Sequence, residues 1–537
     1  MTAFSFPSYP PTRPLRATSG PPPKVIVVGA GIAGLSAAYT LNEWGFDVTV
    51  LEASNRPGGR ILTLRDGFSH GLHADAGAAF IPGGHPYTVG FAQHFGLQLD
   101  LIPSGPLAPV DYLNGTLVCD TLSPNAAWPV PLSPNELGKT PLDWARAYAG
   151  AALGQILAID PRSAEWPAGL TDIDAVSFAA LLAKNGASPG AIRVLRLGYS
   201  DLWGDGVDST SALLILRDMA WMLAILMANS PSASQPSTGS ETTAPATPAN
   251  PSDPALHPAM RGFHARQAAA HRVGLAPSPL INGTSLYRIR GGGDQLPKAF
   301  AKSLGQRIRY GAVVTEIEQS DNGVIVSTDD FRKFTSDRVI VTASYSLVRS
   351  MQFTPPLPDA KARVVQGLRY TSVTRVFLEF SQRVWVTKGQ SGTASTDLPE
   401  LPNQVLPGVW IEDATQTQDS PNGILDCYYV GEWARRLGKM GENERVAFTL
   451  SQVEKVFPGA KAQFTGNALS KVWDDDPWTK GDYCWFAPGE MAAFCPQLAT
   501  AVGRIHFAGD HTSALPGWMQ GAIESGVRAA NEINAAV

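Results

Sequence analysis

The hydrophobic residues near the start of the chain change from one spacing to another within a short segment. The run Val25–Val28 is unbroken and β-branched, which is typical of a strand buried on both faces of a parallel sheet. Apolar residues then recur at helical spacing from Leu35 to Leu41, and a second apolar run over 48–51 ends at Glu52. This succession predicts a strand, a turn, a helix and a second strand.

A glycine-rich turn lies between the first strand and the helix. Its glycines, Gly29, Gly31 and Gly34, have the spacing G-x-G-x-x-G. In such a turn the first glycine forms the bend, the second lets a pyrophosphate approach the backbone, and the third lets the helix pack closely on the strand. The free N–H groups of the helix would face the phosphates, and Glu52 could accept hydrogen bonds from a ribose. We therefore expect a dinucleotide site rather than an ordinary βαβ turn.

The rest of the hydrophobic pattern alternates between helical and strand-like segments, which predicts an α/β (α+β) protein. The segment 211–227 is apolar nearly all round, so it should form a buried helix or one that lines a pocket. Other helices are expected over 177–184, 295–304 and 517–537, and strands over 313–317, 323–328, 338–342 and 504–507.

The chain is long enough for two interleaved domains. We expect a Rossmann-type FAD-binding domain built from three separated pieces, and a substrate domain with a mixed sheet and helices built from the segments between them. A proline-rich tail comes first, and a Ser/Pro/Thr-rich stretch that cannot bury enough apolar surface should be a flexible insertion. The expected boundaries are 1–23 for the tail, 24–102, 286–345 and 470–537 for the FAD-binding domain, 103–285 and 346–469 for the substrate domain, and 229–258 for the insertion.

Composition narrows the classes of function. Hydrophobic residues make up 44% of the 537 residues and charged residues 17%, as in a soluble globular protein. The formal net charge of -5 gives no reason to expect nucleic acid or an anionic membrane as a partner. The four cysteines lack metal-binding spacing, so we expect no metal site and a reduced, intracellular set of thiols. Without a signal-peptide pattern or a membrane-spanning run, a cytoplasmic location is expected.

Several motifs carry a resemblance to a known family. They are the glycine fingerprint, R-P-G-G-R over 56–60, D-A-G-A-A-F over 75–80, W-D-D-D-P-W-T-K-G-D-Y over 473–483, and F-A-G-D-H-T-S followed by G-W-M-Q-G-A-I-E-S-G over 507–526. Through these motifs about half of the chain resembles the flavin-dependent amine oxidases: monoamine and polyamine oxidases, L-amino-acid oxidases and flavin histone demethylases. The resemblance implies FAD as the cofactor.

The resemblance also implies which residues would contact FAD. The pyrophosphate would lie against the glycine turn, the ribose against Glu52, and the diphosphate and ribityl region against Arg60 and Asp510. The D-A-G-A-A-F segment would lie near the flavin ring, the backbone of Val314 would hold the adenine, and that of Met519 would meet the pyrimidine edge. The residues carried over are Gly29, Gly31, Ile32, Ala33, Gly34, Glu52, Arg60, Gly77, Ala78, Ala79, Val314, Asp510, Trp518 and Met519.

Two aromatic residues are expected beside the reacting carbon. Trp518 stands where the family usually has an aromatic residue facing the flavin, and an indole can hold an amine by cation–π attraction. The alternative for Trp518 is packing at a helix start, and Tyr483 is a weaker candidate for the opposite wall. Monoamine oxidases bind the flavin through a cysteine, but that position is Gly481 here. We therefore expect non-covalent FAD, with the nearby Cys484 as a packed thiol.

Arg375 is the third residue expected at the reacting centre, and it departs from the family pattern. Most members have a lysine there, which holds a water next to flavin N5 and is tied to the reaction with oxygen. Arginine cannot act as a base, although it can order a water, stabilise superoxide or bind a carboxylate in a fork. L-amino-acid oxidases commonly carry an arginine for the α-carboxylate just after D-x-G, where this chain has Phe80 and no arginine.

The expected function is FAD-dependent oxidation of a small amine or amino acid. The resemblance implies that hydride passes from the carbon bearing the nitrogen to flavin N5, that the imine hydrolyses, and that O2 is reduced to H2O2. The alternatives left open are an FAD-dependent dehydrogenase, desaturase or monooxygenase-like relative acting on C–N or C–C bonds, and a flavin-bearing interaction module without turnover. A homodimer is the assembly considered.

Overall fold

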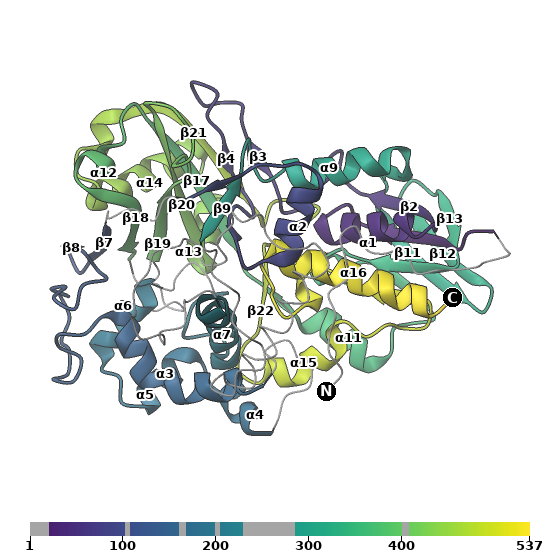
Figure 1. Cartoon of the computed structure of the whole chain (residues 1–537), viewed down its shortest axis with the longest axis horizontal. Coiled ribbons are helices and arrows are strands. Elements are labelled where there is room, and N and C mark those ends of the chain that lie inside the picture. Colours follow the sequence, from purple (N-terminus) through teal and green to yellow (C-terminus); the bar gives the residue numbers. More distant parts are fainter. Residues whose placement is uncertain (1–20, 103–107, 160–167, 199–203, 229–284, 400–407) are drawn as a thin grey trace, which may run out of the picture.

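The computed structural model shows a parallel-sheet unit, a large mixed sheet and a layer of helices arranged around a common centre (Figure 1). The residues that the structure describes are 21–102, 108–159, 168–198, 204–228, 285–399 and 408–537. The expected insertion over 229–258 and nearly all of the expected tail over 1–23 lie outside the described residues.

A five-stranded parallel sheet brings together strands that are far apart in the sequence. The order of the strands is β10-β2-β1-β14-β23. The run Val25–Val28 lies in the central strand, which pairs with β2 on one side and β14 on the other, and this explains its unbroken hydrophobicity. The strands are β1 (Lys24–Val28), β2 (Asp47–Glu52), β10 (Ile308–Tyr310), β14 (Arg338–Val341) and β23 (Ile505–Phe507).

Helices cover one face of the parallel sheet and a smaller sheet covers the other. Val25 and Val27 share a hydrophobic cluster with the helices α1 (Ile32–Glu43), α9 (Gln295–Leu304) and α16 (Met519–Ala535). The alternate residues of β1 share a second cluster with a four-stranded sheet of order β13-β12-β11-β15. Its strands are β11 (Val314–Ser320), β12 (Gly323–Thr328), β13 (Lys333–Ser336) and β15 (Gln352–Thr354).

A seven-stranded sheet forms the second unit, with the order β21-β17-β20-β19-β18-β7-β8. Neighbouring strands are antiparallel except for β18 and β7. One face packs on α14 (Glu442–Val456) through residues such as Val376, Cys427 and Tyr429. The strands are β7 (Ala108–Leu113), β8 (Thr116–Cys119), β17 (Val373–Phe380), β18 (Gln390–Asp397), β19 (Gly408–Asp413), β20 (Gly423–Val430) and β21 (Phe464–Val472).

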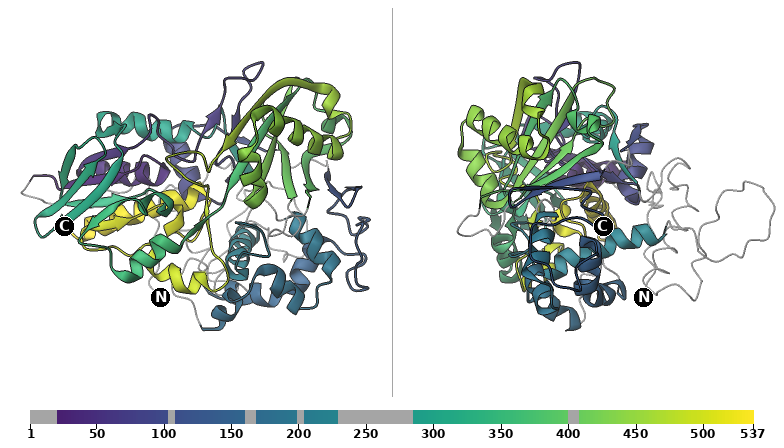
Figure 2. Two further views of the ribbon diagram at one scale, coloured as in Figure 1. Left: turned by 180° about the vertical axis from the view of Figure 1, so that it is seen from behind. Right: turned by 90° about the vertical axis from the view of Figure 1, so that its left-hand side faces the viewer.

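A layer of helices lies below this sheet in Figure 1 and also in the view from behind in Figure 2. At the start of α3, Thr140 Oγ1 accepts a hydrogen bond from Asp143 N–H and the Asp143 carboxylate accepts one from Thr140 N–H, which forms a capping box. The described side chains over 212–216 are buried, as the apolar pattern predicts for this helix. The layer contains α3 (Pro141–Leu157), α4 (Ala168–Asp174), α5 (Phe178–Lys184), α6 (Pro189–Gly198) and α7 (Ala212–Ala228).

Shorter elements connect these layers. The helix expected over 517–537 begins only at Met519, because Gly517 has a φ of 81° that no α-helix contains. The short strands are β3 (Thr63–Leu64), β4 (Ala74–Asp75), β5 (Ile81–Pro82), β6 (Leu99–Leu101), β9 (Leu286–Ile289), β16 (Arg369–Tyr370) and β22 (Cys484–Trp485). The remaining helices are α2 (Pro86–His94), α10 (Tyr345–Val348), α11 (Asp359–Gly367), α12 (Val384–Thr387), α13 (Gly431–Lys439), α15 (Glu490–Leu498), η1 (Gly305–Arg307), η2 (Ala460–Gln463) and η3 (Asp510–Thr512).

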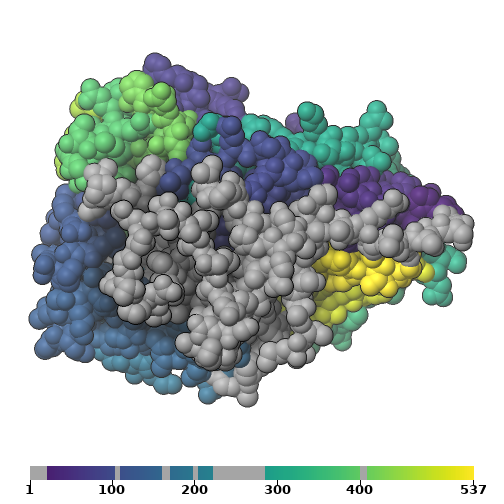
Figure 3. Space-filling model, in the orientation of Figure 1, coloured from purple at the N-terminus to yellow at the C-terminus, as the bar shows by residue number. Residues whose placement is uncertain are grey.

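The two ends of the described chain meet in the parallel-sheet unit. Helix α16 packs directly against α1, and Figure 3 shows the C-terminal part in yellow beside the N-terminal part in purple. The fold is therefore the expected α/β arrangement with a Rossmann-type unit and a second, mixed unit, while the exact domain boundaries stay a prediction. Within the described ranges, each helix is too short or too polar to cross a membrane.

Candidate active site

A large cavity lies between the parallel sheet, the seven-stranded sheet and α7. Its volume is about 1040 Å³, at the upper end of the range of about 300–1,000 Å³ that is usual for small-molecule sites. The cavity can therefore hold a large cofactor together with a substrate. The sequence-predicted residues that line it are Gly29, Gly31, Ile32, Ala33, Glu52, Arg60, Gly77, Ala78, Ala79, Val314, Arg375, Tyr483, Asp510, Trp518 and Met519.

The glycine turn forms one end of the cavity, and its glycines have different surroundings. A Cβ on Gly31 would meet no atom within 4 Å, whereas a Cβ on Gly34 would lie 2.0 Å from the Gly29 carbonyl oxygen. Gly34 does not line the cavity, and its lack of a side chain permits the helix to pack closely on the turn. Helix α1 has no side-chain cap and no acidic residue in its first turn, so its first N–H groups are available to an anion. This end fits a diphosphate.

Glu52 lines the cavity beside this turn and also holds it in shape. Its Oε2 accepts a hydrogen bond of 2.6 Å from Ala30 N–H, and its Oε1 accepts bonds of 2.8 Å from Ser54 N–H and 2.6 Å from Ser54 Oγ. A carboxylate oxygen has two lone pairs, so the group retains acceptor capacity for a ribose hydroxyl. The predicted ribose contact stays a prediction.

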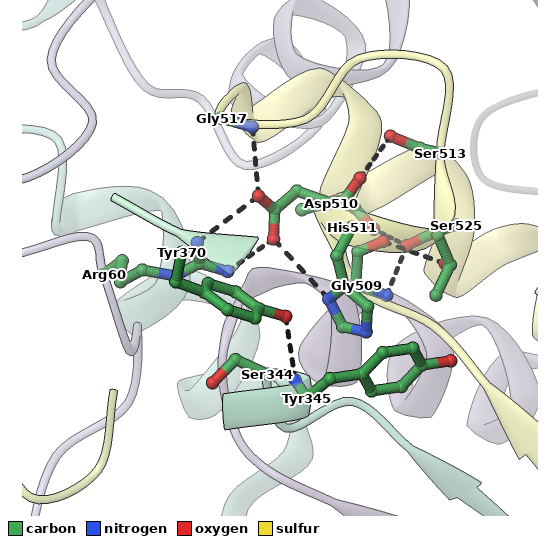
Figure 4. A network of polar contacts seen from close by, with 12 residues as sticks. Arg60, Ser344, Tyr345, Tyr370, Gly509, Asp510, His511, Ser513, Gly517 and Ser525 are labelled. Atoms are coloured by element: carbon green, nitrogen blue, oxygen red, sulfur yellow. Dashed lines mark hydrogen bonds and ion pairs between the residues drawn. The ribbon is translucent and has the colours of Figure 1, made fainter. Parts of the chain in front are cut away.

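The half-buried Arg60 and the buried Asp510 form an ion pair in the cavity lining (Figure 4). Arg60 Nη1 also donates to the Asp482 carbonyl oxygen at 2.5 Å, and Asp510 accepts from Gly517 N–H at 3.0 Å. Burial raises the pKa of Asp510, but Arg60 and the hydrogen bond from Gly517 outweigh it, and the net pKa is below its usual value. Burial lowers the pKa of the neighbouring His511 to about 3. The pair is thus charged beside a neutral imidazole.

Residues 77–79 line the cavity, and their segment is held by hydrogen bonds from several sides. Trp473 Nε1 donates to the Ala76 carbonyl oxygen at 3.0 Å, and Arg375 Nη1 donates to the Gly77 carbonyl oxygen at 2.6 Å. A Cβ on Gly77 would lie only 1.8 Å from the Arg60 carbonyl oxygen, so only glycine allows this approach. Such a rigid backbone of small residues fits a flat ring lying against it.

The seven-stranded sheet closes the other end of the cavity with one row of side chains. Arg375 of β17, Tyr428 of β20 and Trp410 of β19 are partners across the neighbouring strands, and all three line the cavity. The ring of Phe80 lies 6.0 Å from that of Trp410 in an edge-to-face arrangement. This end is therefore an aromatic compartment with one guanidinium at its edge.

Two arginines at this end are each paired with a buried acid. Arg375 forms an ion pair with Asp426 of β20, and Arg288 Nη2 lies 2.8 Å from Glu412 Oε1 of β19. Arg288 also lies 4.7 Å from the centre of the Phe80 ring and is not among the residues that line the cavity. Burial raises the pKa of Glu412 to about 7 in spite of the attraction of Arg288.

The C-terminal part of the chain contributes Trp518 and Tyr483 to the cavity lining. The His85 ring stands 5.1 Å from the Trp518 ring at 89°, and burial lowers the pKa of His85 to about 3. His85 is thus a neutral support for the indole. Gly517 packs against Tyr483, whose Cβ lies 3.3 Å from where a Gly517 Cβ would be. The structure places both predicted aromatic residues, Trp518 and Tyr483, in the lining of this cavity, and their roles stay predictions.

The position expected for covalent flavin attachment suits only glycine. Gly481 has a φ of 116°, and a Cβ there would lie 3.1 Å from Tyr370 Cβ. Cys484 is buried, and burial raises the pKa of its thiol well above its usual value. Within the described part of the lining no cysteine is present. The geometry fits FAD held without a covalent bond.

No sequence motif pointed to Trp410, Tyr428 or the acids Asp426 and Glu412. The signal was period-two alternation in two hydrophobic segments, which places Trp410 with Glu412 on one face of the first strand and Asp426 with Tyr428 on one face of the second. Without strand pairing that pattern does not say which face meets the cavity.

Comparison with known proteins identifies the family. The model of the flavin containing amine oxidoreductases matches residues 32–167 and 271–534. YobN of Bacillus subtilis (strain 168), to which an L-amino-acid oxidase activity is ascribed, is 28% identical over 96% of this chain and 95% of its own. The L-amino acid oxidase Lm29 of Lachesis muta is 27% identical over 97% of this chain and 89% of its own.

The solved structure of cyclohexylamine oxidase from Brevibacterium oxydans IH-35A has the same fold, with a TM-score of 0.74 and 21% identity over 96% of this chain and 99% of that chain. Wild-type putrescine oxidase bound to putrescine is similar, with a TM-score of 0.70 and 22% identity over the same shares. The chain therefore belongs to the flavin-containing amine oxidoreductases and carries out FAD-dependent oxidation of an amine or amino acid.

Proposed function

We propose that this enzyme is an oxidase of amines that lack an α-carboxylate, with O2 as the electron acceptor. The balanced reaction is R–CH2–NH2 + O2 + H2O → R–CHO + NH3 + H2O2. FAD, when bound, supplies the chemistry of taking hydride from the carbon and returning the electrons to O2. The protein supplies binding, orientation and a dry compartment.

The observation that carries this proposal is the state of the arginines in the described lining. Arg56 donates to the carbonyl oxygens of its own loop, Arg60 pairs with Asp510, and Arg375 pairs with Asp426. The segment 80–86, where L-amino-acid oxidases commonly carry an arginine for the α-carboxylate, contains no arginine. A carboxylate taken into this compartment would lose its hydration without gaining an unpaired guanidinium.

The side chains of the compartment have roles that suit an amine with an apolar body. Phe80, Trp410 and Tyr428 offer apolar ring surfaces that exclude water from the body of the substrate. Trp518 and Tyr483 line the side where the amino group would be held against an indole face. Arg375 keeps its proton at any ordinary pH, so it orients and does not act as a base.

The test uses two substrates with the same body. Purified enzyme is mixed without oxygen with phenethylamine or with L-phenylalanine while the oxidised-flavin absorbance near about 450 nm is followed; air is then admitted and H2O2 is assayed. We expect rapid bleaching by phenethylamine and recovery with H2O2. Faster bleaching by L-phenylalanine would contradict the substrate class. Bleaching without recovery in air would contradict O2 as the acceptor, and no bleaching by any amine would favour the relatives that act on C–C bonds.

Two further proposals concern the enzyme in its surroundings. A cytoplasmic location is supported by the four cysteines, which are all free in the structure. A homodimer stays a prediction, and sedimentation of the purified enzyme checks it.

A further inference from the structure

Four charged side chains next to the aromatic compartment form two ion pairs, Arg375 with Asp426 and Arg288 with Glu412. Asp426 and Glu412 are direct partners across β20 and β19, and their side chains are buried. Two adjacent carboxylates in a buried place repel each other unless each has a cation. Arg375 matches Asp426 and Arg288 matches Glu412, while the nearby Lys471 is matched by Asp476 at 2.6 Å.

The guanidinium of Arg375 is largely occupied by these contacts. Its Nε and Nη2 donate to the Asp426 carboxylate, and its Nη1 donates to the Gly77 carbonyl oxygen at 2.6 Å. The pair thus uses the Nε/Nη2 face of the guanidinium, one of the two faces with which an arginine can grip a carboxylate, and the Gly77 carbonyl oxygen engages Nη1 of the other. Through the hydrogen bond to Gly77, Arg375 also connects the seven-stranded sheet to the backbone at the cavity lining.

We infer that Asp426 determines the substrate class of this enzyme: by pairing with Arg375 it denies the α-carboxylate of an amino acid the guanidinium that stands beside Tyr428 in the cavity lining. A second carboxylate that approached Arg375 would meet the repulsion of Asp426 as well as the attraction of the guanidinium. An amine without a carboxylate meets no such opposition. Asp426 acts through Arg375 and is a positioning residue. This inference rests on the proposed oxidation of carboxylate-free amines.

The test is the variant Asp426→Asn, which keeps the shape of the side chain and removes its charge. The measured quantity is the ratio of kcat/KM for phenethylamine to kcat/KM for L-phenylalanine. We expect the ratio to fall by at least about 10-fold, because Arg375 then has an uncompensated charge to offer. The control is Glu412→Gln, the same chemical change at the neighbouring acid, whose partner Arg288 does not line the cavity. In the control the ratio should change by less than about 3-fold.

A binding measurement gives a second readout that does not depend on turnover. Benzoate carries a carboxylate on an aromatic body, and its binding is followed by titration of the flavin absorbance. We expect a Kd at least about 10-fold lower for Asp426→Asn than for the wild type. In the double variant Arg375→Gln/Asp426→Asn the extra affinity should vanish, because the guanidinium that provides it is gone.

The possible outcomes separate this inference from the proposed function. If the wild type prefers L-phenylalanine, the proposed substrate class is wrong, whatever the variants do. If Asp426→Asn retains FAD and shows no change in either the ratio or the affinity for benzoate, the role of Asp426 is refuted while the proposed function stands. If Asp426→Asn does not fold, the double variant Arg375→Gln/Asp426→Asn is measured instead. A selective loss of L-phenylalanine turnover and benzoate binding in this double variant, relative to wild type, would show that Arg375 already binds carboxylates. That result would overturn the inference.

Discussion

The glycine turn offers a test in which cofactor binding and folding separate. Gly31 has a φ of -66° and a ψ of 168°, which alanine adopts without strain, and its Cβ would point into empty space. Gly34, three residues later, would place a Cβ 2.0 Å from the Gly29 carbonyl oxygen. We therefore expect Gly31→Ala to fold normally and to bind FAD poorly, whereas Gly34→Ala destabilises the protein itself.

The size of the effect follows from the geometry. Without FAD, Gly31→Ala should be close to neutral, because the restriction that alanine places on the unfolded chain, worth about 0.4–1 kcal/mol, offsets the loss of glycine as the N-cap of α1. With FAD, the methyl group keeps the diphosphate from the first N–H groups of α1. Losing one or two hydrogen bonds to a charged group costs about 1.5–3 kcal/mol each. The Kd for FAD should therefore rise by about 10-fold to 1,000-fold or more.

The assay compares the protein stripped of FAD with the reconstituted protein. Quenching of flavin fluorescence gives the Kd, and thermal denaturation with and without FAD gives the stabilisation by the cofactor, which mass action ties to that Kd. The matched control is Gly150→Ala in α3, where a Cβ also meets no atom within 4 Å but the site does not line the cavity. Wild-type affinity in Gly31→Ala would refute the close approach of the diphosphate to Gly31. A loss of stability without FAD would refute the open space around its Cβ.

Acid precipitation should release all of the flavin into the supernatant from both the wild type and Cys484→Ser, as measured by absorbance. The reason is that Gly481 carries no thiol and Cys484 lies outside the cavity lining. Flavin that stays with the pellet would contradict non-covalent binding. A second prediction concerns Lys361, whose pKa burial lowers to about 6. Between that pH and its usual pKa the unfolded chain binds a proton that the folded state does not, so the free energy of unfolding rises with pH by up to about 1.4 kcal/mol per unit. Lys361→Met should flatten the dependence of Tm on pH between about 6.5 and 8.5. Lys302→Met, at an exposed lysine, serves as the control. Parallel curves for wild type and Lys361→Met would contradict the lowered pKa of Lys361.

The nucleotide end of the protein could be predicted from the sequence because its determinants are local. The run Val25–Val28, the glycine turn and Glu52 lie within one βαβ unit, where period and backbone geometry are properties of the chain itself. The helix over 295–304 and the burial of 212–216 were predictable for the same reason. The resemblance of the motifs to those of the amine oxidases also led to Arg60, Asp510, Trp518 and Arg375.

The substrate end was decided by the tertiary structure. Arg375, Trp410 and Tyr428 become one row only because β17, β20 and β19 pair in one register, and nothing in a single strand specifies its partner or its offset. The state of Arg375 depends on Asp426, a residue 51 positions later in the sequence, which reaches it across that same pairing. The sequence by itself predicted the end of the cavity that fits a diphosphate, since the glycine turn and Glu52 lie in one continuous segment, whereas the charge balance around Arg375 arises from long-range strand pairing.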